Sequence, residues 1–120
     1  MDIREDIIFI VNPISGTQDK AAILEYIESN INRNIFNPRI IKTEYAGHGY
    51  DIARKAVEDK VSFVVAIGGD GTINEIGSAL VHSDTALGII PCGSGNGLAR
   101  HLHIPMNYQK ALQVINKANV

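Results

Sequence analysis

The chain has 120 residues, which is enough for one compact domain with a hydrophobic core and too few for two ordinary domains. Hydrophobic residues make up 45% of it and charged residues 20%, a balance typical of globular proteins and not of disordered or fibrous ones. The net charge of -2 lacks the basic excess of nucleic-acid-binding proteins, so DNA and RNA are disfavoured as partners.

The first half of the chain predicts two steps from strand to helix. The apolar run Ile7–Val11 predicts a strand buried on both faces, which Asn12-Pro13 ends. From about Asp19 to Ile31, apolar residues recur at helical spacing. Arg39–Thr43 then predicts a shorter second strand, and Gly47-His48-Gly49 leads into a second helix.

The second half repeats this rhythm twice and ends with two helices. The predicted elements are a strand at Val61–Ile67, a turn at Gly68–Gly71, a helix marked by Ile73, Ile76, Gly77 and Leu80, a strand at Ala86–Ile90, a turn at Pro91–Gly95, a short helix from Asn96 that ends before Pro105, and a last helix marked by Tyr108, Ala111, Leu112 and Ile115. Because strands alternate with helices, we predict an α/β fold in three layers, with right-handed crossovers and helices on both faces of a parallel sheet.

Glycine-rich loops are predicted at one edge of this sheet. They are Asn12–Gly16 after the first strand, Gly68–Thr72 after the third and Pro91–Asn96 after the fourth. Ligands of such sheets bind beyond the carboxyl ends of the strands, where these loops gather. A phosphate needs several backbone N–H groups at hydrogen-bonding distance, and glycine has no Cβ to hold it away. The three loops together therefore predict a phosphate site.

Two simpler explanations of the glycines were weighed. A tight turn at Gly68–Gly71 with Thr72 as helix N-cap explains one such loop about equally well, but it accounts poorly for three loops at one edge. The sequence has no Gly-x-x-x-x-Gly-Lys-Ser/Thr motif. It also lacks Gly-x-Gly-x-x-Gly, because Asn74 and Leu98 stand where the last glycine of each cluster is required. Neither a P-loop enzyme nor a standard dinucleotide fold is predicted.

Two carboxylates are the candidate catalytic groups. A carboxylate among phosphate-binding glycines is unfavourable unless a metal or a hydroxyl needs it. Asp70 therefore fits either of two roles: holding Mg²⁺, directly or through water, or accepting the proton of the hydroxyl that attacks a γ-phosphate. Glu75 could assist from the following helix, although acidic residues also favour a helix N-terminus for structural reasons. No direct metal ligand is assigned.

Other polar residues have structural explanations. Cys92 is the single cysteine, which excludes an internal disulfide, fits a reducing compartment such as the cytoplasm, and predicts a small buried residue. His48 either orients a nearby loop or serves the start of a helix. His101 and His103 are two residues apart and point in different directions on a helix, so a metal pair is disfavoured. Arg100 either reaches a phosphate or lies on a solvated helix face.

The three loops resemble those of the diacylglycerol kinase catalytic family, which includes sphingosine kinases and bacterial lipid kinases. The matching stretches are Phe9–Gly16, Ile67–Glu75 and Leu87–Arg100, with a weaker match at Thr43–His48. The resemblance runs from about Phe9 to Pro105. Gly-Gly-Asp-Gly-Thr alone is shared with NAD kinases and phosphofructokinases, so the combination of loops makes it specific. It implies the fold of the amino-terminal domain of NAD kinase and diacylglycerol kinase.

The resemblance also implies cofactors, contacts and partners. It implies that ATP, with Mg²⁺, binds in a cleft between this domain and a following β-rich domain that supplies the lipid pocket. We expect residues 1–120 to be the nucleotide-binding part of a longer protein whose other domain meets the lipid at a membrane surface; a homodimer stays open. The resemblance implies that Asp70 serves catalysis. The implied nucleotide contacts are Asn12, Ser15, Gly16, Thr43, Gly68, Gly69, Gly71, Thr72, Gly93, Ser94, Gly95 and Asn96.

The third loop departs from many bacterial members, which read Gly-Thr-Gly-Asn-Asp. Ser94 replaces the threonine and Gly97 the aspartate, a pattern closer to sphingosine-kinase-like members. Serine keeps the hydroxyl, whereas the lost carboxylate puts its metal or water role in doubt. The acceptor, diacylglycerol or a sphingoid-like lipid, is therefore open. A kinase of a soluble substrate such as NAD, and a nucleotide-binding module without catalysis, are the alternative functions.

Overall fold

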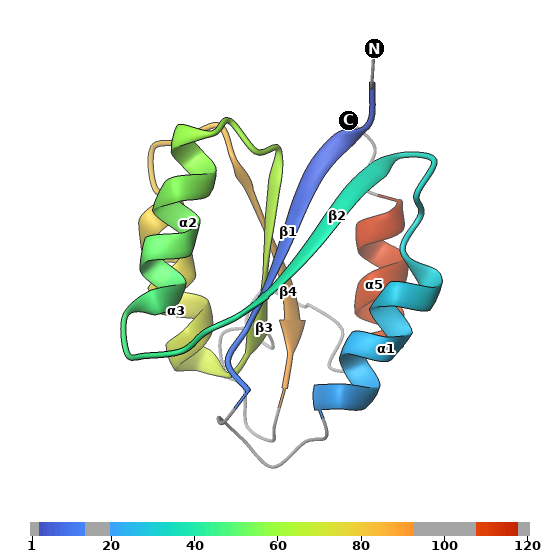
Figure 1. Ribbon diagram of the computed structural model, residues 1–120, viewed down its shortest axis with the longest axis horizontal. Coiled ribbons are helices and arrows are strands. Elements are labelled where there is room, and N and C mark those ends of the chain that lie inside the picture. Colours follow the sequence, from blue (N-terminus) through green and yellow to red (C-terminus); the bar gives the residue numbers. More distant parts are fainter. Residues whose placement is uncertain (1–2, 14–19, 93–107, 118–120) are drawn as a thin grey trace.

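One parallel sheet organises the protein. The computed structural model describes residues 3–13, 20–92 and 108–117. The four strands, in the spatial order β2-β1-β3-β4, all run in the same direction, with their carboxyl ends at the bottom of Figure 1. They are β1 (Glu5–Val11), β2 (Phe36–Lys42), β3 (Phe63–Gly68) and β4 (Ala86–Pro91).

Helices cover both faces of the sheet (Figure 1). On one face lie α1 (Lys20–Asn30) and α5 (Tyr108–Asn116), and on the other lie α2 (His48–Glu58) and α3 (Asp70–Leu80). The predicted three-layer α/β fold is confirmed. No helix in the described part of the chain combines the length and the hydrophobicity needed to cross a bilayer.

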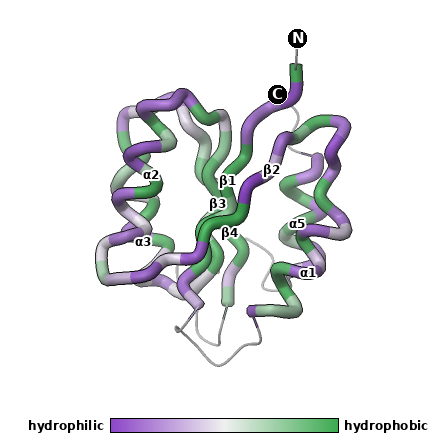
Figure 2. The backbone as a smooth tube through the Cα atoms, in the orientation of Figure 1, coloured by the Kyte–Doolittle hydropathy of each residue, from purple (hydrophilic) through white to green (hydrophobic). Residues whose placement is uncertain are grey.

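The central strand β1 connects two hydrophobic cores. Its residues alternate between the faces, so Ile7 and Phe9 pack with α1 and α5, whereas Ile8 and Ile10 pack with α2 and α3. Both sides are buried, which is why this strand is a continuous apolar run. Figure 2 shows the same hydrophobic concentration along the middle of the sheet. Truncating the fully buried Phe9 to alanine is expected to cost about 3–5 kcal/mol of stability.

The predicted helix faces are the buried ones. In α3, Ile73, Ile76 and Leu80 are buried as predicted, together with Ala79. The stripe of α5 consists of Ala111, Leu112 and Ile115, also as predicted. Helical periodicity was a sufficient signal here because each of these helices buries a single face against the sheet.

The second strand is longer than predicted. It begins at Phe36 and not at Arg39, so Asn37 and Pro38 lie inside it. Proline has no N–H to donate and is tolerated in a strand that has a neighbour on one side only. Within the described residues, β2 is such an edge strand, and Pro38 lies opposite Ile7 of β1. The predicted short helix from Asn96 lies outside the described residues.

Candidate active site

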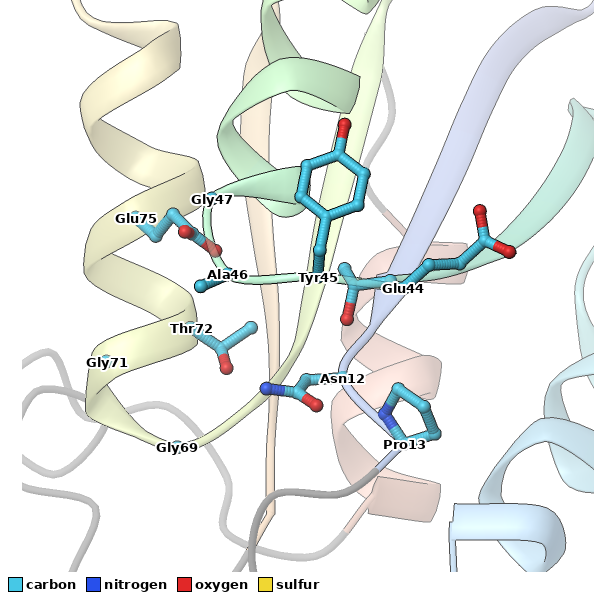
Figure 3. Close-up of a pocket in the computed structure, with 11 residues that line it drawn as sticks. Asn12, Pro13, Glu44, Tyr45, Ala46, Gly47, Gly69, Gly71, Thr72 and Glu75 are labelled. Atoms are coloured by element: carbon cyan, nitrogen blue, oxygen red, sulfur yellow. The ribbon is translucent and has the colours of Figure 1, made fainter.

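A hollow of about 560 Å³ lies at the carboxyl ends of β1, β2 and β3 (Figure 3). The strands end level with one another, because Val11 pairs with both Lys42 and Ile67. The chain segments that follow these strands consequently surround one space. Its lining residues are Asn12, Pro13, Thr43, Glu44, Tyr45, Ala46, Gly47, Gly69, Gly71, Thr72 and Glu75.

Six of the predicted site residues line this hollow together. They are Asn12, Thr43, Gly69, Gly71, Thr72 and Glu75. The Asn12 and Thr72 side chains extend toward each other across the hollow (Figure 3). The base is tied by a hydrogen bond of 2.9 Å from the Thr43 amide to the Val11 carbonyl. Residues separated by 60 positions in the sequence thus meet at one edge of the sheet.

The remaining predicted residues lie elsewhere. Gly68 is buried at the end of β3, beneath the hollow. Asp70 is exposed at the first position of α3, between the lining residues Gly69 and Gly71, and does not itself line the hollow. Six further predicted contacts lie outside the described residues: Ser15, Gly16, Gly93, Ser94, Gly95 and Asn96.

The segment that leads into the third glycine loop begins beside the second. The Cys92 amide donates a hydrogen bond of 2.9 Å to the Gly68 carbonyl. A Cβ placed on Gly69 would lie 3.9 Å from the Cys92 carbonyl oxygen. Cys92 itself is buried, as predicted, and burial raises the pKa of its thiol, with the charge of Lys20 acting weakly in the opposite direction. A protonated, buried thiol is a poor nucleophile.

Gly68 and Gly71 differ in what surrounds them. A Cβ on Gly68 would lie 2.8 Å from the Thr72 Cβ, so only glycine lets the Thr72 side chain lie back over the end of β3. A Cβ on Gly71 would meet nothing within 4 Å. Gly68 is therefore required by packing inside the protein, whereas the space beside Gly71 is open to a ligand.

The amino end of α3 faces this edge without a side-chain cap. Gly69 occupies the N-cap position and has no side chain that could accept hydrogen bonds from the first turn. The sequence-based alternative that Thr72 is the N-cap is wrong, because Thr72 is the third residue of the helix. Its hydroxyl lines the hollow instead (Figure 3). An uncapped helix amino end, with its positive dipole, favours an anion.

Glu75 has a place both in the hollow and in the packing of two helices. It is half-buried and lines the hollow. A Cβ on the buried Gly49 of α2 would lie 2.7 Å from its Oε2 atom, so the absence of a side chain at Gly49 makes room for this carboxylate. Glu75 is thereby held close to α2, and its carboxylate borders the hollow.

The carboxylates at this edge suit a magnesium ion in their chemistry. Mg²⁺ in nucleotide sites typically takes one or two carboxylates together with phosphate oxygens and water. Asp70 and Glu75 lie one turn and a quarter apart at the start of α3, and both are oxygen donors. Within residues 3–13, 20–92 and 108–117, no group of three potential ligands could hold a metal by itself. The two carboxylates fit an ion that shares its coordination with a nucleotide.

The family of the chain follows from comparison with known proteins. Residues 6–120 match the family model described as the diacylglycerol kinase catalytic domain. The chain belongs to this family. A diacylglycerol kinase of Staphylococcus saprophyticus is 33% identical over 108 residues, which are 88% of this chain and 35% of that protein. An uncharacterised protein of Synechocystis is 32% identical over 119 residues, which are 90% of this chain and 27% of that one.

A solved structure of the same family has the same fold. The crystal structure of a diacylglycerol kinase from Bacillus anthracis superposes with a TM-score of 0.80 at 28% identity, covering 99% of this chain and 44% of that one. The chain thus spans about a third of the length of the diacylglycerol kinase it matches in sequence and under half of this structural relative.

Sequence reasoning missed one wall of the hollow. Glu44, Tyr45, Ala46 and Gly47 line it, but only Thr43 of this segment was predicted as a contact. The signal was the weak family match at Thr43–His48, which contains no phosphate-binding glycine pattern. Pro13 was treated only as the end of a strand, and it also lines the hollow.

Proposed function

We propose that this chain is the nucleotide-binding domain of a lipid kinase that transfers the γ-phosphate of ATP to a lipid hydroxyl. The observation that carries the proposal is the hollow itself, where Asn12, Gly69, Gly71 and Thr72 surround one space at the uncapped amino end of α3. Membership of the diacylglycerol kinase catalytic family supports a lipid as acceptor. The acceptor is diacylglycerol or a sphingoid-like lipid.

The residues around the hollow divide into binding and catalytic groups. The Gly69 and Gly71 backbone and the α3 amino end receive phosphate oxygens, while Asn12, Thr43 and Thr72 supply side-chain donors. Gly68 permits the placement of Thr72. The proposed contacts from the other loops are Ser15, Gly16, Gly93, Ser94, Gly95 and Asn96.

Asp70 and Glu75 are the proposed catalytic residues. Transfer requires that the attacking lipid hydroxyl lose its proton as the bond to the γ-phosphorus forms and the bond to ADP breaks. Asp70 accepts that proton or holds Mg²⁺, and Glu75 assists from one turn further along α3. When bound, Mg²⁺ would offset the phosphate charge. A second, β-rich domain of the longer protein would bring the lipid, so the 120-residue chain alone binds nucleotide weakly and turns over poorly.

Calorimetric titration of this chain with ATP, in the presence and absence of Mg²⁺, tests the site. Wild type is expected to bind Mg-ATP with a millimolar or lower Kd, and absence of binding at millimolar ligand contradicts the proposal. Asp70→Asn separates the two roles of the carboxylate. If it holds the metal, the variant loses the gain in affinity that Mg²⁺ gives; if it accepts the proton, Mg-ATP affinity is retained.

Phosphate transfer by the full-length protein tests the acceptor. Radiolabelled ATP is offered with diacylglycerol, with a sphingoid base and with NAD. Labelled lipid supports the proposal and identifies the acceptor, whereas labelled NAD without labelled lipid favours the alternative of a kinase for a soluble substrate. Binding of ATP without transfer to any of them favours a nucleotide-binding module.

A further inference from the structure

One wall of the proposed nucleotide pocket is a short surface loop. Residues Thr43–Gly47, here the pocket loop, connect β2 to α2 and contribute five of the eleven lining residues. They face the start of α3 across the hollow (Figure 3). Most of the loop is exposed, and Tyr45 is 57% exposed, so burial of apolar surface does little to fix its path. Other contacts must hold it in place.

His48, the residue after the loop, makes three contacts back to it. Its Nδ1 accepts a hydrogen bond of 2.9 Å from the Glu44 amide. Its ring stacks on the Tyr45 ring with a centroid separation of 4.3 Å and an interplanar angle of 15°. Its backbone amide donates to the Tyr45 carbonyl over 3.1 Å. The imidazole thus satisfies an amide that would otherwise be left at the end of β2.

Tyr45 is held at its other end as well. Its hydroxyl donates a hydrogen bond of 3.1 Å to the Asp51 carboxylate, one turn along α2 from His48. This bond is the main reason why the pKa of Tyr45 is raised, so the phenol keeps its donor proton through the neutral range. His48, Tyr45 and Asp51 form a connected set, here the loop clamp, that joins the pocket loop to the first turns of α2.

The side chain of His48 does not serve its own helix. It is the first residue of α2, whose N-cap is Gly47 in a left-handed conformation and which has no side-chain cap. The imidazole instead points back to the Glu44 amide. Of the two sequence-based explanations for this residue, the orientation of a nearby loop therefore describes its side-chain contacts.

The hydrogen bond to Glu44 requires one particular form of the imidazole. A backbone amide is always a donor, so Nδ1 must present its lone pair, and the ring proton belongs on Nε2. A doubly protonated ring would set two N–H groups against each other and open the clamp. The charged groups that border this region are Glu44 of the loop, Arg39 of β2 and, on α2, Asp51, Lys55 and Asp59.

We propose that His48 is a positioning residue of the nucleotide pocket, which keeps the pocket loop in its nucleotide-binding position through its bond to Glu44 and its stack on Tyr45. The inference rests on the proposed nucleotide site. It adds a residue that does not line the hollow and acts on the nucleotide only through the loop.

Titration with Mg-ATP of three His48 variants of the 120-residue chain tests the proposal. His48→Ala removes both contacts and is expected to weaken binding about tenfold, the equivalent of about 1.4 kcal/mol. His48→Phe keeps a ring for stacking and loses the acceptor. His48→Asn restores an acceptor near the position of Nδ1 and should recover most of the affinity. His82→Asn, at the opposite edge of the sheet, is the matched control and should bind like wild type.

Acidification gives a readout that a general loss of packing would not reproduce. Between about pH 8 and pH 5, wild-type affinity should fall more than that of His48→Asn, because only the imidazole gains a proton in this range. The protonation of ATP itself affects both proteins equally. Parallel pH profiles would overturn the role of the ring.

Backbone hydrogen exchange at Glu44 separates this inference from the proposed function. The amide should exchange slowly in wild type and in His48→Asn, and quickly in His48→Ala, whether or not nucleotide binds. Wild type that binds no Mg-ATP would defeat the proposed function. Wild-type-like binding by a folded His48→Ala, or unchanged exchange at Glu44, would overturn the positioning role and leave the nucleotide site standing.

Discussion

The two ends of the sheet both carry a hollow, and they differ in what surrounds it. The hollow at the carboxyl end measures about 560 Å³, and the one at the amino end, between Glu5 and Ala86, about 700 Å³. The first lies at the amino end of α3, where unpaired N–H groups attract anions. The second lies beyond the carboxyl ends of α2 and α3, where C=O groups repel them. Helix direction, and not volume, distinguishes the candidate nucleotide site.

The use of glycine differs between the two ends in the same sense. At the amino end, Lys60 and His82 hold a left-handed backbone, with φ of 58° and 62°, where glycine would be unstrained. At the carboxyl end, Gly68, Gly69 and Gly71 have no such backbone requirement. Glycine is thus absent where the backbone alone would favour it and present where close approach requires it. This contrast supports a ligand at the carboxyl end.

Aspartates at the two ends should differ most in catalysis. In the full-length protein, Asp70→Asn is expected to lower kcat about 10²–10⁴-fold, because a proton acceptor or metal ligand is lost. Asp84→Asn removes an exposed carboxylate at the amino-end hollow and should leave kcat unchanged. Lipid phosphorylation at saturating ATP measures both. Equal activity of the two variants would remove the functional distinction between the ends.

Two glycines of the second loop should differ in stability. Gly68→Ala forces a Cβ to within 2.8 Å of Thr72 and is expected to lower the free energy of unfolding by about 1–3 kcal/mol. Gly71→Ala meets open space in the first turn of α3 and should change it by less than about 1 kcal/mol, in the stabilising direction. Urea unfolding compares them. A destabilised Gly71→Ala would show that this glycine, too, is needed for the fold.

The Thr72 hydroxyl should matter for nucleotide affinity. A hydrogen bond to a charged phosphate contributes about 1.5–3 kcal/mol, so Thr72→Val is expected to raise the Kd for Mg-ATP about tenfold or more. Ser78→Ala removes a hydroxyl from an exposed position of the same helix, where it bonds only to the Glu75 carbonyl over 2.8 Å. Calorimetry on the pair should show an effect for Thr72 alone.

The strained residues of the amino end should give the smallest effects. Lys60→Gly and His82→Gly each relieve a left-handed conformation and are expected to stabilise the protein by up to about 1 kcal/mol, since glycine's own entropy cost offsets part of the gain. Thermal unfolding measures this gain. Mg-ATP affinity should not change, and a loss of affinity in either variant would connect the amino end to the ligand.

Periodicity predicted most of the fold, and local composition misled it once. The helices α2, α3 and α5 followed from apolar stripes because each buries one face. The start of β2 was missed, since Asn37-Pro38 reads as a break unless the strand is known to lie at an edge. Strand order arises from packing between distant segments and has no local signature.

The candidate site divides in the same way. Asn12, Gly69 and Thr72 were predicted because their loops follow buried strands directly and their residue types suit phosphate. The wall made by the pocket loop was missed, because its course depends on Gly47 being left-handed and on the contacts of His48. Neither can be read from residue types alone.

The placement of Asn12 at the end of the central strand has a mechanical consequence. Displacing it would disturb the hydrogen bonds of β1 to both β2 and β3, whereas the pocket loop can move by breaking surface contacts only. The cavity therefore has a stiff floor and one compliant side. Adjustment to nucleotides of different size should be concentrated in that side, while the phosphate end keeps a constant geometry.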